Sequence, residues 1–210
     1  MTGAVGRSSA PLLALASAAY LARPGRVGPH EERLFRRLNS SAGPAEPAIW
    51  SVMQMGNGLA SVVAPIYVRA RGGSWPAAAR VGLAGAGGWQ LAKAVKRGIP
   101  RERPARLLGG VALRDGDPEG RGFVSGHATV AMSVALAAAP VLSPAEGAAL
   151  FVAALVVAGA RVHVGAHLPL DVLGGLALGA WWGRLCAGVQ VGPSEPRSAA
   201  VAGGARGEQP

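Results

Sequence analysis

Long apolar runs alternate with short polar segments along most of this chain. The runs cover residues 10–22, 47–68, 75–95, 128–142, 144–163 and 170–189, and arginine, lysine, glycine or proline separates them. A helix of about 20 apolar residues is long enough to cross a bilayer. The pattern therefore predicts an all-α, polytopic membrane protein, a helix bundle of about six transmembrane helices.

Two stretches near the N-terminus each allow two interpretations. Residues 10–22 fit a short first membrane helix or a signal peptide, and the helix is preferred because Arg23-Pro24-Gly25-Arg26 is a poor cleavage site. Residues 31–39 place Leu34, Phe35 and Leu38 on one helical face and charges on the other. This second stretch fits a helix in the membrane interface or a solvated connecting helix.

Composition agrees with a membrane protein. Half of the 210 residues are hydrophobic, 15% are charged, and the mean hydropathy is +0.30. We expect one membrane-embedded domain over residues 1–190. Residues 191–210 are rich in glycine, proline, serine and alanine, and are expected to be a disordered tail.

The net charge of +10 suits an anionic partner, but the basic residues cluster between apolar runs and not along one amphipathic face. That distribution argues against nucleic acid and favours an anionic substrate or membrane lipids. The single cysteine, Cys186, excludes an internal disulfide and a multi-cysteine metal site.

Three short polar clusters border the apolar runs. They are Lys96 with Arg103-Pro104, Ser125-Gly126-His127, and Arg161 with His167 and Asp171. All of them fall in the junctions 96–127 and 161–171. These junctions lie on the same side of the predicted bundle, so we expect the clusters to meet at one membrane face.

The residue types in these clusters suit phosphate chemistry. Lysine and arginine supply fixed cations, and a serine–glycine helix start offers free N–H groups to an anion. A histidine near a carboxylate can act as a nucleophile or a base. His163, His167 and Asp171 also allow a metal site on one helix face, but Pro169 breaks that helix before Asp171. We therefore expect no metal and no cofactor.

On these clusters the chain resembles the type 2 phosphatidic acid phosphatase superfamily. The family motifs Lys-x6-Arg-Pro, Pro-Ser-Gly-His and Ser-Arg-x5-His-x3-Asp are matched in order and spacing. Two positions depart from the motifs: Val124 stands at the proline and Ala160 at the serine. These departures put the rate in doubt more than the type of reaction.

The resemblance implies a metal-independent hydrolase of a lipid phosphate or diphosphate that works through a phosphohistidine. By analogy His167 is the nucleophile, Asp171 holds its tautomer, and His127 protonates the leaving oxygen. The phosphate-binding groups are Lys96, Arg103, Ser125, Gly126 and Arg161.

The same resemblance implies a multi-pass protein of the plasma membrane with its active site on the extracytoplasmic face. Phosphatidic acid, undecaprenyl diphosphate and a prenyl-phosphoryl sugar remain open as substrates, and the oligomeric state is also open. The alternative functions are a haloperoxidase-type or soluble-phosphate activity, and a protein that only binds or transports a lipid phosphate.

Overall fold

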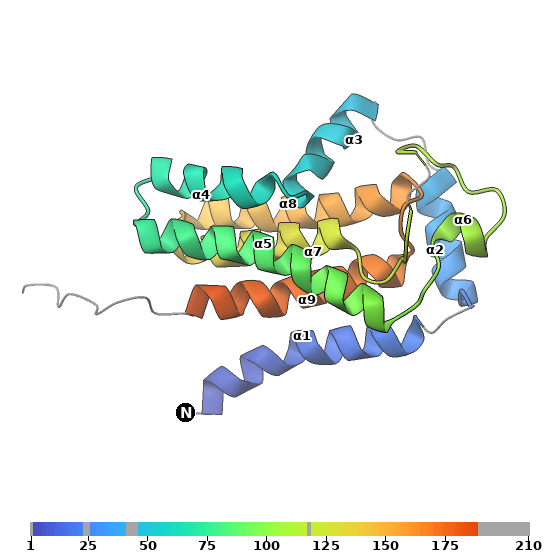
Figure 1. The fold of residues 1–210 in the computed structure, drawn as a ribbon, viewed down its shortest axis with the longest axis horizontal. Coiled ribbons are helices and arrows are strands. Elements are labelled where there is room, and N and C mark those ends of the chain that lie inside the picture. Colours follow the sequence, from blue (N-terminus) through green and yellow to red (C-terminus); the bar gives the residue numbers. More distant parts are fainter. Residues whose placement is uncertain (1, 23–25, 41–45, 117–118, 189–210) are drawn as a thin grey trace, which may run out of the picture.

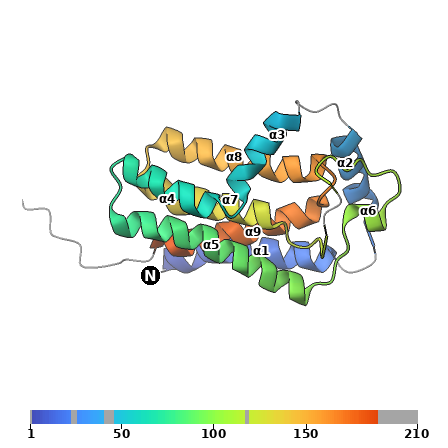
Figure 2. The same ribbon diagram turned by 45° about the horizontal axis from the view of Figure 1, so that its top comes forward.

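The computed structural model describes residues 2–22, 26–40, 46–116 and 119–188, and all regular structure in these ranges is helical. Figures 1 and 2 show a bundle of long helices with shorter ones across one end. The helices in chain order are α1 (Thr2–Leu21), α2 (Pro29–Ser40), α3 (Glu46–Met53), η1 (Gln54–Gly56), α4 (Ala60–Ala70), α5 (Trp75–Gly98), α6 (Pro104–Leu107), α7 (Gly126–Ala138), η2 (Ala139–Val141), α8 (Pro144–His163) and α9 (Pro169–Gly188).

Local sequence explains where the long helices begin. Ser74 caps α5 by accepting a hydrogen bond from the backbone N–H of Ala77. Ser143 and Glu146 form a reciprocal capping box at the start of α8. The helices predicted from the apolar runs after residue 74 are therefore confirmed to within a few residues. The predicted tail, 191–210, lies outside the described residues.

The prediction of one continuous helix over residues 47–68 is wrong. The segment forms α3, η1 and α4, with a break around Asn57, whose side-chain oxygen accepts a hydrogen bond from the N–H of Leu59 at 2.8 Å. Gly56 packs against α7 so closely that an added Cβ would lie 2.7 Å from the carbonyl oxygen of His127. The break lets the chain pass next to the second polar cluster.

Helices α7 and α9 pack with almost no side chain between them. Three glycines of α9, spaced four residues apart, lie against the backbone of α7, a small-residue contact typical of membrane helices. A Cβ added to any of them would overlap a backbone oxygen of α7; the facing pairs are Gly175 with Ser125, Gly179 with Thr129 and Gly183 with Ser133.

Large apolar side chains also cover the outside of the bundle. Leu13 of α1, Ile66 of α4 and Trp75 of α5 are 67%, 63% and 73% exposed, and α8 exposes Phe151 and Val152. Within the described ranges α8 alone combines the length and the apolar composition needed to cross a membrane. Exposed apolar faces of this extent fit a lipid environment, and the count of six spans stays a prediction.

Candidate active site

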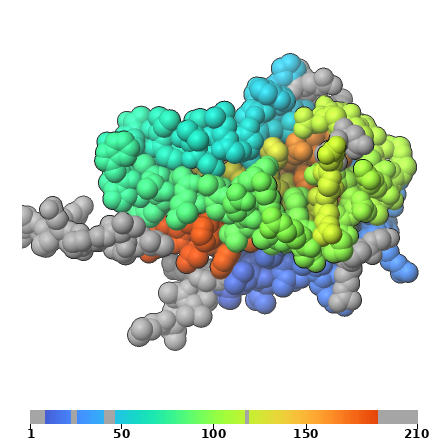
Figure 3. Space-filling view, viewed as in Figure 1, coloured from blue at the N-terminus to red at the C-terminus, as the bar shows by residue number. Residues whose placement is uncertain are grey.

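The three polar clusters meet at one end of the bundle. There α5 and α8 end and α7 and α9 begin, while α2 and α6 stand alongside (Figures 1 and 2). A cavity of about 240 Å³ opens at this end, and Figure 3 shows a hollow between α3, α5 and the loop that precedes α7. Its lining residues are Trp89, Ala92, Lys93, Lys96, Arg103, Gly126, His127, Arg161 and His167.

His167 lies in the short connection between α8 and α9. Its side chain is 3% exposed, and its Nδ1 is 3.6 Å from Oδ2 of Asp171. Burial lowers the pKa of this imidazole well below its usual value, and the nearby cations Lys96, Arg103 and Arg161 lower it further. The neutral ring, which is the nucleophilic form, is therefore favoured.

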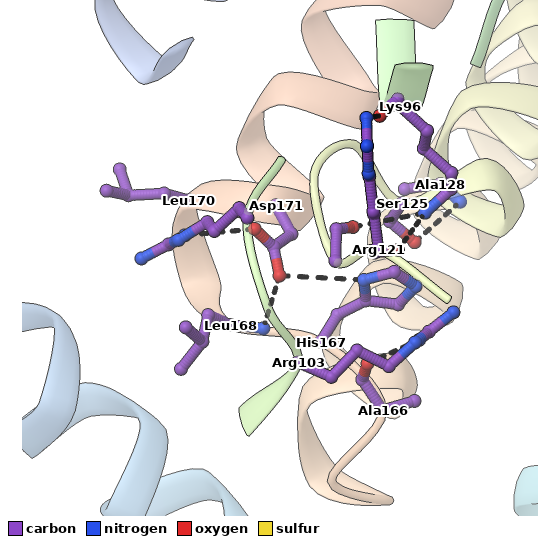
Figure 4. A network of polar contacts seen from close by, with 12 residues as sticks. Lys96, Arg103, Arg121, Ser125, Ala128, Ala166, His167, Leu168, Leu170 and Asp171 are labelled. Atoms are coloured by element: carbon purple, nitrogen blue, oxygen red, sulfur yellow. Dashed lines mark hydrogen bonds and ion pairs between the residues drawn. The ribbon is translucent and has the colours of Figure 1, made fainter. Parts of the chain in front are cut away.

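Asp171 is fully buried behind His167 (Figure 4). Its Oδ1 accepts a hydrogen bond from Nη1 of Arg101 at 2.9 Å, and its Oδ2 accepts one from the N–H of Leu168 at 2.9 Å. Among the described residues Nδ1 of His167 has no hydrogen-bond partner. The imidazole thus faces Asp171 at ion-pair distance, and its other nitrogen, Nε2, is left for the cavity.

Backbone carbonyls hold the first cluster's cations at the cavity wall. Lys96 and Arg103 come from the end of α5 and the residue before α6, and both reach across to later segments (Figure 4). Lys96 Nζ donates to the carbonyls of Arg121 (2.9 Å) and Gly122 (3.1 Å), and Arg103 donates to those of Glu119 (3.0 Å), Gly120 (3.1 Å) and Ala166 (2.8 Å).

Arg161 brings a third cation to the cavity from the last turn of α8. Its Nη1 donates to Asp115 at 2.7 Å and lies 3.3 Å from the sulfur of Met53. Its buried Nε has no hydrogen-bond partner among the described residues. A phosphate oxygen in the cavity would give this nitrogen an acceptor.

The second cluster opens α7, as predicted. Ser125 is buried, and its Oγ accepts a hydrogen bond from the N–H of Ala128 at 3.5 Å, so the side chain caps the helix and does not line the cavity. Gly126 lies against Trp89, whose ring would be 3.1 Å from an added Cβ. Trp89 also meets the ring of His127 edge to face, with centroids 6.1 Å apart. The glycine is therefore needed for this wall of the cavity.

The two motif departures both lie outside the cavity. Val124 is fully buried and packs with Phe123 and Leu178. Ala160 packs against Ile49 and Met53 and lines a separate, mostly apolar groove between α2, α3 and α8. A serine side chain at position 160 would therefore point from α8 toward this groove and not toward the cavity with His167.

Sequence reasoning singled out neither Glu31 nor Arg101, and it overlooked Trp89 and Lys93 as cavity residues. Arg101 lies two positions before Arg103 in a segment rich in charged residues, so no local signal distinguished it from its neighbours. Glu31 gave no signal, since it looks like any charge on an amphipathic helix. His163, the first residue of the metal hypothesis, forms a hydrogen bond with the carbonyl of Leu38 at 2.9 Å, and the described residues contain no group of three that could hold a metal.

Comparison with known proteins identifies the family. The PAP2 superfamily model matches residues 76–192, more than half of the chain and all three clusters. The chain belongs to the PAP2 superfamily. Of the helices described above, α1 to α4 lie before the matched segment.

Two curated relatives, from Rhizobium johnstonii and Rhizobium etli, carry the name lipid A 1-phosphatase. They are 38% and 36% identical to this chain over an aligned segment of 101 residues. That segment is 46% of this chain and 41% and 43% of the length of the two relatives. This chain thus spans less than half of the relatives it matches. The crystal structure of Aquifex aeolicus LpxE aligns with a TM-score of 0.66 and 25% identity over 73% of this chain and 92% of its own.

A second solved structure has the same fold. It is a transmembrane PAP2-type phosphatidylglycerolphosphate phosphatase from Bacillus subtilis, with a TM-score of 0.67 and 20% identity over 86% of this chain and 94% of its own. The all-helical PAP2 fold predicted from the sequence is thereby confirmed.

Proposed function

We propose that this protein is a membrane phosphatase that hydrolyses the phosphate ester of a lipid through a phosphohistidine. The observation that carries the proposal is the position of His167, between a buried carboxylate on one side and, on the other, a cavity lined by four lysine and arginine side chains. A neutral imidazole held opposite a phosphate pocket is what nucleophilic phosphoryl transfer needs.

In this mechanism Nε2 of His167 attacks phosphorus in line with the leaving oxygen. Lys96, Arg103 and Arg161 neutralise the equatorial oxygens, and the N–H groups at the start of α7 assist them. His127 protonates the leaving oxygen, while Asp171 stabilises the positive charge on the attacked ring. Water then cleaves the phosphorus–nitrogen bond, releases inorganic phosphate and regenerates neutral His167.

A lipid substrate is supported by two independent observations. The bundle exposes large apolar side chains on α1, α4, α5 and α8, as a protein in contact with lipid would. The curated relatives are named for a phosphatase of a phosphorylated lipid. A lipid phosphomonoester is therefore the first substrate class to test, and a lipid diphosphate is the second.

Purified protein in detergent should release phosphate from one or more members of a panel: phosphatidic acid, phosphatidylglycerolphosphate, lipid A and undecaprenyl diphosphate. Activity should survive EDTA, and vanadate should inhibit as a mimic of the five-coordinate phosphorus. Binding of these lipids without any turnover would favour a capture or transport protein. Loss of activity on chelation, restored by a divalent ion, would reject the metal-free mechanism.

We further propose that the active site faces the extracytoplasmic side of the plasma membrane and that residues 1–190 act as one domain. Arg106 is exposed on α6, close to the cavity end of the bundle. Arg106→Cys in a Cys186→Ala background should react with an impermeant thiol reagent in intact cells. Labelling only after lysis would place the site on the cytoplasmic side.

A further inference from the structure

Among the described residues, Arg101 is the only arginine whose side chain is completely buried. It contacts Asp171 on the side of that carboxylate away from the cavity. Its Nη1 donates to Asp171 at 2.9 Å and to Glu31 at 3.1 Å, and its Nη2 donates to Glu31 at 2.6 Å. Arg101 itself lines no part of the cavity. It cannot contact a phosphate there, so its role must be exerted through its partners.

Glu31 comes from α2, outside the segment that matches the family, and is 8% exposed. Besides holding Arg101, its Oε1 accepts a hydrogen bond from the N–H of Leu170 at 2.9 Å. Leu170 is in the first turn of α9, next to Asp171. Glu31 thus binds both the arginine that contacts Asp171 and the backbone next to Asp171.

We propose that Glu31 and Arg101 are positioning residues, and that the row Glu31–Arg101–Asp171 sets the direction and the charge of the carboxylate that faces His167. The inference rests on the proposed phosphatase function. It assigns a catalytic purpose to α2, which closes the end of the bundle and contributes no residue to the cavity.

Charge balance explains why two residues are needed. A buried carboxylate without a partner tends to take up a proton and lose its charge. The positive charge and the hydrogen bond of Arg101 favour the ionised form of Asp171, yet an arginine bound to Asp171 alone would draw the carboxylate away from the imidazole. Glu31 accepts hydrogen bonds from both Nη1 and Nη2 of Arg101. With two carboxylates and one guanidinium, the row keeps one net negative charge behind His167.

The acid limb of the pH–rate profile should report that charge, because a negative neighbour raises the pKa of an imidazole. The groups that face His167 from the elements around it are Lys96, Arg103, His127, Arg161 and Asp171. All five stay in place in the variants below, so a shift of the limb can be traced to the row behind Asp171.

Glu31→Gln removes one negative charge and should move the acid limb of kcat/KM to lower pH by about 0.5–1 unit. Arg101→Met removes the charged partner of Asp171, so the buried carboxylate should take up a proton; the limb should then also move to lower pH, and kcat should fall. Arg101→Lys keeps the charge but loses the two-pronged contact. It should leave the limb in place and reduce kcat by about 10–100-fold, the range seen when orienting partners are removed.

The matched control is Glu32→Gln, on the same helix, where the carboxylate is partly exposed and pairs with Arg36. This variant should retain the wild-type kcat and the wild-type position of the acid limb of kcat/KM. Thermal unfolding in detergent shows whether each variant folds. If Arg101→Met does not fold, Glu31→Gln and Arg101→Lys still decide the matter.

The outcomes separate this inference from the proposed function. A wild-type protein that releases no phosphate from any substrate rejects the function. An active wild type, with folded Glu31→Gln and Arg101→Lys variants that keep both its kcat and its acid limb, rejects the positioning role. A limb that moves to higher pH in a folded Arg101→Met variant would also overturn it, since Asp171 would then keep its charge without the arginine.

Discussion

The carboxylate of Asp115 lies 2.7 Å from Nη1 of Arg161, so an acidic side chain already neutralises part of a guanidinium that lines the cavity. Asp115 belongs to the loop between α6 and α7 and is partly exposed, whereas Arg161 is buried in α8. A phosphate dianion that binds Arg161 must therefore share it with Asp115 or displace that carboxylate.

Asp115→Asn should consequently tighten the binding of a phosphate mimic. Removing a like charge beside the anion should lower the inhibition constant of vanadate by about threefold to tenfold, a modest effect because the carboxylate is partly screened by solvent. Glu119→Gln, on the same loop and exposed, is the control and should change little. Weaker vanadate binding by Asp115→Asn would mean that Asp115 aims Arg161 and does not compete with the anion.

The low pKa of His167 predicts activity at acidic pH. A depressed pKa means that the ring stays neutral, and so nucleophilic, as the pH falls through 6.5, and it gains a proton only at lower pH. The acid limb of kcat/KM for an aryl phosphate, corrected for the ionisation of the substrate, should lie well below pH 6.5. A limb at or above pH 6.5 would show that the free enzyme does not hold His167 in this environment.

The glycine contact between α7 and α9 predicts unequal effects of alanine. Gly179→Ala would push a Cβ into the backbone of Thr129, and the overpacking should cost about 1–3 kcal/mol. Gly159→Ala in α8 meets nothing within 4 Å and should be neutral or stabilise by about 0.4–1 kcal/mol. Thermal unfolding of the two variants in one detergent compares them. Equal stability would mean that α7 and α9 are farther apart than described.

Restoring the motif serine should not restore rate. Ala160 packs against Ile49 and Met53 and lines the apolar groove, not the cavity with His167. Ala160→Ser should therefore change kcat and KM for phosphate release by less than about twofold, since surface-type substitutions away from a site have small effects. A tenfold gain in kcat/KM would show that position 160 reaches the phosphate.

The sequence was sufficient to predict part of the cavity wall. Lys96 and Arg161 lie at the ends of apolar runs, His127 comes just before one, and Arg103 lies in the polar segment that joins two of them. Helix direction then brings these residues to one face. The long helices α5, α8 and α9 followed from the same runs, because their lengths and caps are local properties.

What the sequence did not predict depends on contacts distant in the chain. Glu31 and Arg101 are 70 positions apart and meet only because α2 folds across the end of the bundle. The break near Asn57 did have a local signal in Gly56-Asn57-Gly58, but the apolar residues on both sides favoured one helix. The position of the break is explained by the close approach of Gly56 to α7, a contact that the sequence does not reveal.

If His167 is the nucleophile and His127 the general acid, the two histidine variants should respond differently to two substrates. His167→Ala should abolish turnover of both a lipid phosphate and p-nitrophenyl phosphate. His127→Ala should lose about 10²–10⁴-fold on the lipid, whose alkoxide needs a proton, and far less on the aryl ester, whose nitrophenolate leaves without one.

The most direct measurement is acid-labile phosphoenzyme trapped by rapid quench with labelled p-nitrophenyl phosphate. The proposed mechanism predicts phosphoenzyme in wild type and in His127→Ala, and none in a folded His167→Ala variant. Phosphoenzyme in His167→Ala, with none in His127→Ala, would contradict the assignment and reverse the two roles.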